Sequence, residues 1–200
     1  MALDAMDVLD WRRRVAGIYR DVRAEPDAAR AHQSWVEARL DLLATHAASP
    51  VPAAERAIFA GGRVAPYDAA FRFVVPVDTH IEPERREVQT GTDGVVAFER
   101  IGRVHLDGFG SLDVWWLDSY GGGLFLPFRD ATSGVSTYGA GRYLLDTTKG
   151  ADLGGDASNL VIDLNFGYQP SCAYDEDWAC PLPGVGNRLE AEVPVGELFR

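Results

Sequence analysis

The chain has 200 residues, of which 46% are hydrophobic and 24% charged, as is usual for a globular domain with one hydrophobic core. Its 30 acidic and 19 basic residues give a formal net charge of −11, which argues against nucleic acid and anionic lipid as general partners. No apolar run approaches the roughly 18 residues that span a bilayer. The acidic start of the sequence lacks the apolar core of a signal peptide, so we expect a cytoplasmic protein without membrane contact.

The first 48 residues are expected to form a pair of helices. Between residues 3 and 24, apolar side chains recur at spacings of three and four, which places them on one helix face: Val8, Trp11, Val15, Ile18 and Val22. A second helix is expected to begin at Pro26, whose missing N–H costs nothing in a first turn, and to run to about His46. The prolines within residues 49–52 end it, because a residue before proline avoids the helical conformation.

From Phe71 onward the hydrophobic period changes to two, which is typical of strands. Turns rich in Gly and Asp separate the expected strands, which are residues 71–77, 86–90, 95–106, 112–117, 123–128, 141–145, 160–166 and 189–193. Short links without helices favour an antiparallel meander, and about eight strands suffice to close a small barrel. We therefore predict an α+β fold in a single domain, residues 1–200. A helical pair over 1–48 precedes a β-rich core over 55–200 that curls into a small β-barrel or half-barrel.

Residues 128–144 carry more charge than a plain hairpin turn needs. Arg129 and Asp130 follow one apolar strand and Arg142 opens the next, so both arginines are expected at the same rim of the sheet. Two guanidinium groups, with Tyr138 and the hydroxyl groups of the loop, can hold a carboxylate or a phosphate. The alternative is an Arg–Asp network that only stabilises the loop, in which Asp130 accepts hydrogen bonds from Arg142 or from backbone N–H groups.

Two polar residues, Asp163 and Asn165, share one face of the strand expected at residues 160–166. A carboxylate in mid-strand is costly to bury without partners. This face therefore either turns to solvent or points into a polar interior. In the second case Asp163 is a base or the partner of an arginine.

The two cysteines, Cys172 and Cys180, lie in a long connection that contains Pro and Gly, residues 168–187. Their spacing is not that of a zinc site and the four histidines show no ligand spacing, so no metal or cofactor is expected. In a cytosolic protein both thiols are expected to be reduced, with a reversible disulfide as the alternative. An ordered connection of this length usually covers a site or is held by packing.

Three stretches of the sequence resemble the bacterial domain of unknown function 1684 family: FRDATSGVSTYGAGRYL at 128–144, DLNFGYQPSCAY at 163–174 and CPLPGVGNRLEAEVPVGE at 180–197. The resemblance covers most of the chain and is strongest over residues 125–197. It implies no activity, because none is assigned to that family. It does imply that many polar and turn residues match family motif positions: Arg129, Asp130, Tyr138, Gly139, Gly141, Arg142, Tyr143, Asp163, Asn165, Tyr168, Pro170, Cys172, Cys180, Pro181 and Asn187.

Three functions are compatible with these patterns. The first is a module that binds a small anionic metabolite, whose candidate site comprises Arg129, Asp130, Tyr138, Arg142, Asp163, Asn165, Tyr168, Cys172, Cys180 and Asn187. The second is a hydrolase or isomerase that uses Asp163 or Asp130 as base and an arginine as electrostatic stabiliser. The third is an interaction domain without a small ligand, in which the helices or another chain cover Trp115 or Trp116, because adjacent strand residues point to opposite faces.

Overall fold

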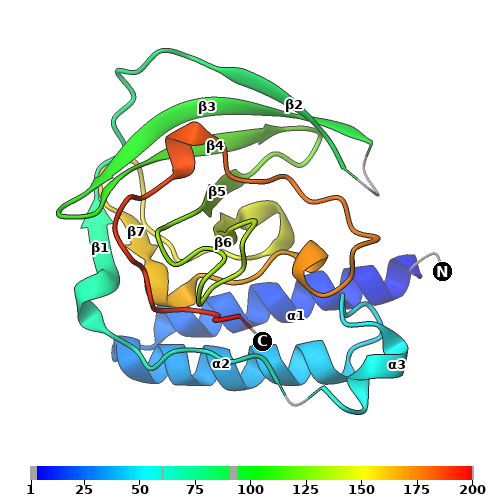
Figure 1. Ribbon diagram of the computed structural model, residues 1–200. Helices are drawn as coiled ribbons and strands as arrows, with labels where there is room; N and C mark the ends of the chain where they lie inside the picture. The colour runs from blue at the N-terminus through cyan, green and yellow to red at the C-terminus, as the bar shows by residue number, and fades with distance from the viewer. Residues whose placement is uncertain (1–3, 60, 91–93, 200) are drawn as a thin grey trace.

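Two long helices lie side by side beneath the strands in the computed structural model, which describes residues 4–59, 61–90 and 94–199 (Figure 1). Helix α1 spans Ala5–Ala24, helix α2 spans Ala28–Thr45, and the one-turn helix α3 spans Ala53–Arg56. The helical pair expected within the first 48 residues is therefore confirmed. In the part of the chain that the structure describes, no helix is both long enough and apolar enough to cross a membrane.

Helix α2 begins two residues later than predicted, at Ala28 and not at Pro26. The Asp27 side chain accepts hydrogen bonds from the backbone N–H groups of Ala29 and Arg30, at 3.0 and 3.1 Å. An aspartate at this position satisfies N–H groups that have no partner within the helix. The carboxylate of Asp27 therefore sets the start of the helix, and Pro26 belongs to the connection between the helices.

The described strands form two antiparallel sheets, and neither closes into a barrel. One sheet pairs β1 (Arg72–Val75) with β7 (Leu160–Asp163). The other is five-stranded in the order β2-β3-β4-β5-β6, with bounds Arg85–Gln89, Val95–Leu106, Gly110–Asp118, Leu124–Phe128 and Arg142–Asp146. The α+β class with antiparallel strands is confirmed, and the prediction of a closed barrel is wrong.

The five-stranded sheet stays open because its edge strands β2 and β6 lie on opposite sides of it. Beyond β6, Tyr143 pairs with Tyr168 through two N–H···O hydrogen bonds of 2.8 Å, so this edge is already occupied. Pro127 in β5 has no N–H to donate to a ladder, and the β5–β6 register shifts beside it. The last described strand, β7, pairs with β1 in its own sheet and leaves too few strands for closure.

The strand expected over residues 160–166 ends early, at Asp163. The Asp163 carboxylate accepts the N–H of Asn165 at 3.2 Å and begins a single turn of 3-10 helix, η3 (Leu164–Phe166). A side chain that bonds to the backbone two residues ahead offers the chain an alternative to the strand ladder. This local bond turns Asn165 away from the strand.

Residues 189–193 do not form the strand that their alternation predicts. Two side chains and the backbone of the 128–144 loop take up the backbone groups of this segment. Asp130 accepts the N–H of Val193 at 3.2 Å, and Arg142 donates to the Val193 carbonyl at 2.8 Å. The Leu189 N–H donates to the Arg129 carbonyl at 2.8 Å, and the Ala131 N–H donates to the Ala191 carbonyl at 3.1 Å. Because each backbone group needs only one such partner, the segment is satisfied without a neighbouring strand.

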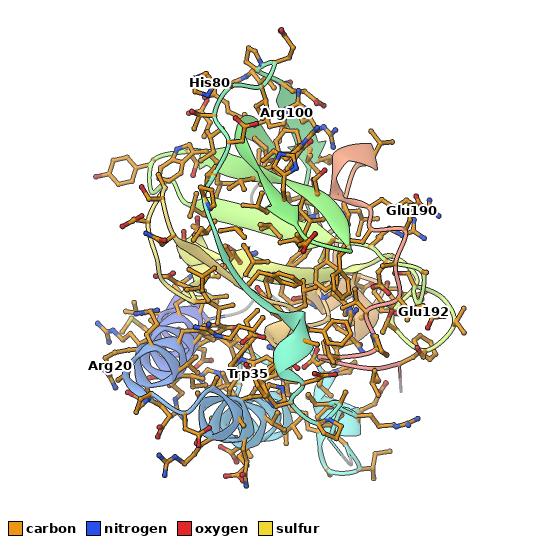
Figure 2. All side chains as sticks on the ribbon, turned by 90° about the vertical axis from the view of Figure 1, so that its left-hand side faces the viewer. Arg20, Trp35, His80, Arg100, Glu190 and Glu192 are labelled. Atoms are coloured by element: carbon orange, nitrogen blue, oxygen red, sulfur yellow. The ribbon has the colours of Figure 1, made fainter. Side chains whose placement is uncertain are left out.

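The main hydrophobic core lies between the helices and the strands. Trp35 of α2 is 1% exposed and packs against Phe166, with ring centroids 5.2 Å apart. Figure 2 shows Trp35 between the helices and the strands above them, whereas Arg20 lies on the outer side of α1. The expected face of α1 also contacts this core, through Val15, Ile18 and Val22.

A second, aromatic cluster lies on the other face of the five-stranded sheet, because neighbouring strand residues point to opposite sides. Its buried members are Phe98, Trp115, Phe125 and Tyr143, and Cys180 packs against them. Figure 1 shows the C-terminal part of the chain running along the sheet and down to the helices. The C-terminal segment, residues 180–199, therefore covers this face.

Candidate functional site

The predicted loop residues Asp130 and Arg142 meet in the interior. Arg142 is 0% exposed, and its Nη2 donates to Asp130 Oδ2 at 2.9 Å. The same guanidinium donates to the carbonyl oxygens of Val193 and Val195. On the other side of the carboxylate, the N–H of Thr132 donates to Oδ1 at 2.8 Å. This geometry matches the alternative of an Arg–Asp network, and the network joins the loop to the C-terminal segment.

One polar atom of this network, Arg142 Nε, is buried without a hydrogen-bond partner among the described residues. The guanidinium lies 4.8 Å from the centroid of the Phe128 ring, close enough for a cation–π interaction. That interaction offsets part of the cost of burying the cation. Every other nitrogen of the guanidinium is hydrogen-bonded to protein, so Arg142 has little left to offer a ligand.

The other predicted residues of the loop region are dispersed. Arg129 is half-buried, and its guanidinium makes no hydrogen bond or ion pair within the described residues. The Tyr138 hydroxyl donates to the Cys172 carbonyl at 3.1 Å. Tyr168 packs under the guanidinium of Arg39, which lies 4.7 Å from the ring centroid. These side chains do not converge with Arg142 on a common ligand.

Asn187 holds the C-terminal segment against β4 and β5. Its Oδ1 accepts from Trp115 Nε1 at 2.8 Å, and its Nδ2 donates to the carbonyl oxygens of Asp113 and Pro127 at 2.8 and 2.9 Å. The C-terminal segment, and not the helices, thus covers Trp115. Trp116, on the other side of the strand, is 40% exposed.

A cleft of about 570 Å³ is lined by residues of β1, β7 and the connection between α1 and α2. Figure 1 shows these elements at its left-hand end. Ligand sites in proteins commonly measure roughly 300–1,000 Å³. Asp163 is the one predicted site residue that lines this cleft among those described. Its lining combines charged and apolar groups from three parts of the chain: Val22, Arg23, Glu25, Pro26, Ala28, Ala31, Arg72, Leu153, Gly154, Gly155, Val161, Asp163 and Phe166.

Asp163 and Arg72 stand opposite each other in the β1–β7 ladder, and both line the cleft. Asp163 is 2% exposed, whereas the Arg72 side chain is 40% exposed. Arg72 Nε lies 3.6 Å from Asp163 Oδ2, beyond the roughly 2.7–2.9 Å of a charge-assisted hydrogen bond. Burial raises the pKa of Asp163, and hydrogen bonds from Asn165 together with the charge of Arg72 offset part of the rise.

Further polar groups hold Asp163 from the protein side of the cleft. The Tyr67 hydroxyl lies 3.4 Å from Asp163 Oδ2, and partial burial raises the pKa of Tyr67 to about 12, so this hydroxyl keeps its proton. Asn165 Nδ2 donates to Asp163 Oδ1 at 2.7 Å. Asp163 and Asn165 are both buried, and the alternative that their face turns to solvent is therefore wrong.

His32 of α2 supports this cluster through the backbone. Its Nε2 lies 3.0 Å from the Asn165 carbonyl, and because a carbonyl only accepts, this nitrogen carries the proton. Burial lowers the pKa of His32, which keeps the second ring nitrogen unprotonated at neutral pH. The ring thus connects α2 to the turn that follows β7.

The two cysteines lie close together and outside the lining of this cleft, and Cys180 packs against the aromatic cluster. Both thiols are half-buried and unbridged, and the Cys172 N–H donates to Cys180 Sγ at 3.4 Å. Among the described residues, no group of three or more His, Cys, Asp or Glu side chains is arranged to hold a metal ion.

Sequence reasoning missed Arg72, Tyr67 and His32 as neighbours of Asp163. The sequence did indicate that Arg72 lies on the polar face of its strand, because side chains alternate between the two faces. Which strand would pair with it depends on contacts between distant parts of the chain, and no local pattern specifies those.

The comparisons with known proteins agree with this fold. A sequence model of the family described as protein of unknown function (DUF1684) matches residues 57–198. The solution NMR structure of the uncharacterized protein from gene locus rrnAC0354 of Haloarcula marismortui is similar, with 31% sequence identity and a TM-score of 0.59. The match covers 83% of this chain and 91% of that one. No curated protein matches the sequence. The chain belongs to the DUF1684 family.

Proposed function

We propose that this protein binds a small anionic molecule in the cleft beside β1 and β7. The loose ion pair between Arg72 and Asp163 is the observation that carries the proposal. The Arg72 side chain is 40% exposed, and within the described residues its one acidic partner is Asp163, 3.6 Å away. It therefore has donors available for a carboxylate or a phosphate, which a guanidinium binds in a planar, two-pronged geometry.

The rest of the lining suggests what such a molecule would look like. Val22, Leu153, Val161 and Phe166 offer an apolar surface. Asp163, as an acceptor, favours a ligand that carries a hydroxyl or an amine near its anionic group. We therefore expect a small carboxylate or phosphate with one such donor and a short apolar body.

We therefore place the anion at Arg72 and not at Arg129 and Arg142, the loop arginines predicted from the sequence. The donors of Arg142 are already bonded to Asp130 and to backbone carbonyls, which argues against Arg142 as an anchor. Arg129 keeps an unpaired guanidinium within the described residues and remains a rival anchor. The two arginines therefore make a matched pair of test positions.

Thermal-shift screening against a library of anionic metabolites tests the proposal. A ligand at a hundredfold excess over its Kd raises the free energy of unfolding by about 2.7 kcal/mol, which is readily detected. We expect at least one compound to shift the wild type and the Arg129→Ala variant but not Arg72→Ala. The opposite pattern would place the site at the loop. The absence of any shift in the wild type would favour an interaction domain without a small ligand.

A second candidate function is hydrolysis or isomerisation with Asp163 as the base. The raised pKa of Asp163 favours it, because a buried carboxyl beside a cleft can exchange a proton with a bound molecule. An Asp163→Asn variant should then still be shifted by the compound while losing its conversion. If the wild type binds the compound and leaves it unchanged, the protein is a binding module.

A further inference from the structure

We propose that Cys172 and Cys180 form a dithiol site that reacts with a small neutral hydroperoxide, with Cys180 as the attacking thiolate and Cys172 as the resolving thiol. The site lies apart from the cleft, because neither cysteine lines it. The two proposals therefore stand or fall separately.

The fold supplies a hydrogen-bond donor to each of the two sulfurs. Cys172 lies in η4 (Ser171–Ala173), and this turn points its backbone N–H at Cys180 Sγ, 3.4 Å away. The Tyr138 hydroxyl donates to the other sulfur, Cys172 Sγ, at 3.8 Å. Tyr143, whose hydroxyl donates to the Pro181 carbonyl at 2.7 Å, holds the residue next to Cys180 in place. These hydrogen bonds hold Cys172 and Cys180 next to each other.

The same contacts make the two thiols chemically different. The hydrogen bond from the Cys172 thiol lowers the pKa of Cys180; the Cys172 N–H and the charge of Lys149 add to this effect, and burial opposes it. The pKa of Cys172 is raised by that shared hydrogen bond and by burial. Since the thiolate is the nucleophile, Cys180 attacks and Cys172 keeps its proton for the second step.

The reaction balances in two steps. The Cys180 thiolate attacks one oxygen of the hydroperoxide, a sulfur–oxygen bond forms, the O–O bond breaks, and the leaving oxygen takes up a proton from water as an alcohol or as water. Cys172 then attacks the Cys180 sulfenic acid, a disulfide forms, and the hydroxide leaves with the Cys172 proton as water. Both thiols together lose two electrons to the peroxide, and a thiol reductant restores them.

The charge of the surroundings selects the oxidant. The loop between the cysteines carries Asp175, Glu176 and Asp177, and the whole chain has a net charge of −11. This field repels an anionic disulfide but has no such effect on an uncharged peroxide. Both thiols are half-buried, so a molecule as small as hydrogen peroxide fits the available access better than a bulky disulfide.

Alkylation kinetics and intact mass of the full chain test this site. We expect neutral iodoacetamide to modify Cys180 at least about fivefold faster than Cys172, because the Cys172 N–H and the lowered pKa of Cys180 favour the thiolate at Cys180. Hydrogen peroxide should remove both reactive thiols, lower the mass by two hydrogens, and be reversed by a dithiol reductant. Cys172→Ser and Cys172→Ala make a matched pair: neither forms the disulfide, but serine retains a donor to Cys180 and should keep its fast alkylation, whereas alanine should slow it about threefold or more.

Circular dichroism of each variant confirms that a rate change does not arise from unfolding. Equal alkylation rates at the two cysteines in the folded wild type would overturn the assignment of Cys180 as nucleophile. Peroxide treatment that adds oxygen to the mass without forming the disulfide would overturn the dithiol itself. Faster oxidation by an anionic aromatic disulfide than by hydrogen peroxide would overturn the proposed class of oxidant.

Discussion

Two Arg–Asp pairs of this protein, Arg142 with Asp130 and Arg72 with Asp163, differ in how completely the chain uses their polar atoms. In the pair of Arg142 with Asp130, both residues are buried and the contact is 2.9 Å, with backbone groups taking up further donors and acceptors. In the pair of Arg72 with Asp163, the acid is buried but the arginine is half exposed, at 3.6 Å, beside a cleft. The first pair is enclosed by the fold, and the second is the pair at which we propose that a ligand binds.

This difference has an energetic meaning. Removing one partner of a buried pair leaves a charge without compensation, whereas an exposed arginine can be solvated by water in place of its partner. Substitutions at the two pairs should therefore separate widely in their effect on stability. We expect the largest loss of stability for Arg142→Ala, a smaller loss for Asn187→Ala and the smallest for Arg72→Ala, whereas Asp163→Asn should change the pH dependence of stability.

The Arg142→Ala variant should be the most destabilised. Its loss leaves the Asp130 carboxylate and the carbonyls of Val193 and Val195 without their donor, so we expect the free energy of unfolding to fall by about 3–5 kcal/mol. Urea unfolding followed by circular dichroism measures this. Arg129→Ala, in the same loop, is the control and should change stability by less than about 1 kcal/mol. Similar losses in the two variants would contradict the comparison.

The Asn187→Ala variant should come next. It leaves the Trp115 indole N–H and two backbone carbonyls buried without partners, and we expect a loss of about 2–3 kcal/mol. The exposed Asn159 offers a matched control, since Asn159→Ala removes the same side chain from a solvated position. If both variants unfold at the wild-type urea midpoint, Asn187 does not hold the C-terminal segment as described.

The Asp163→Asn variant should change the pH dependence of stability. Because burial raises the pKa of Asp163 in the folded state above its unfolded value of about 3.9, the folded state binds the proton more readily. The wild type therefore gains stability as pH falls through the folded pKa, and that gain is complete below the unfolded pKa. At neutral pH the charged, buried carboxylate lowers the free energy of unfolding of the wild type, and the uncharged asparagine side chain of the Asp163→Asn variant does not have this effect.

The measurement is the stability difference between this variant and the wild type at pH 7 and near pH 4. We expect the variant to be at least as stable as the wild type at pH 7 and to lose this relative advantage at the lower pH. His32 is present in both proteins, so its own titration cancels in the difference. A relative advantage that grows on acidification would mean that the pKa of Asp163 is not raised.

The Arg72→Ala variant should show the smallest loss. Because its side chain is 40% exposed and its ion pair is long, we expect a change within about 1 kcal/mol in urea unfolding. Arg142→Ala, measured in parallel, sets the scale for a buried pair. A loss at Arg72 as large as that at Arg142 would show that the two pairs have the same structural role.

Much of the architecture could be predicted from the sequence because it depends on local patterns. The apolar spacing over α1 correctly predicted the face that contacts the core, and strand alternation located β1 to β6 within a few residues. The errors lie where side chains replace backbone partners. Asp27 sets the start of α2, Asp163 ends β7, and Asp130 with Arg142 takes up the N–H and the carbonyl of Val193.

The candidate site was less predictable than the fold. Residues 128–144 have a composition typical of a ligand-binding loop, but Arg142 and Asp130 are bonded to each other and to the C-terminal segment. Asp163 was identified as a polar residue of interest, whereas its partner Arg72 was not. Their pairing joins strands that are far apart in the chain, and composition contains no information on which strands will pair.

The sequence by itself determined the helical pair, most of the strands and the antiparallel class, because these follow from the hydrophobic period and the turn residues. It also determined the family, because the family motifs are recognisable in the sequence. Only the tertiary structure decided that the sheets stay open, which arginine is buried and which one faces a cleft, and that Cys172 and Cys180 meet. The physical reason is that periodicity depends on neighbours along the chain. Burial, ion pairing and the pKa of a carboxyl or a thiol depend on groups that only folding brings together.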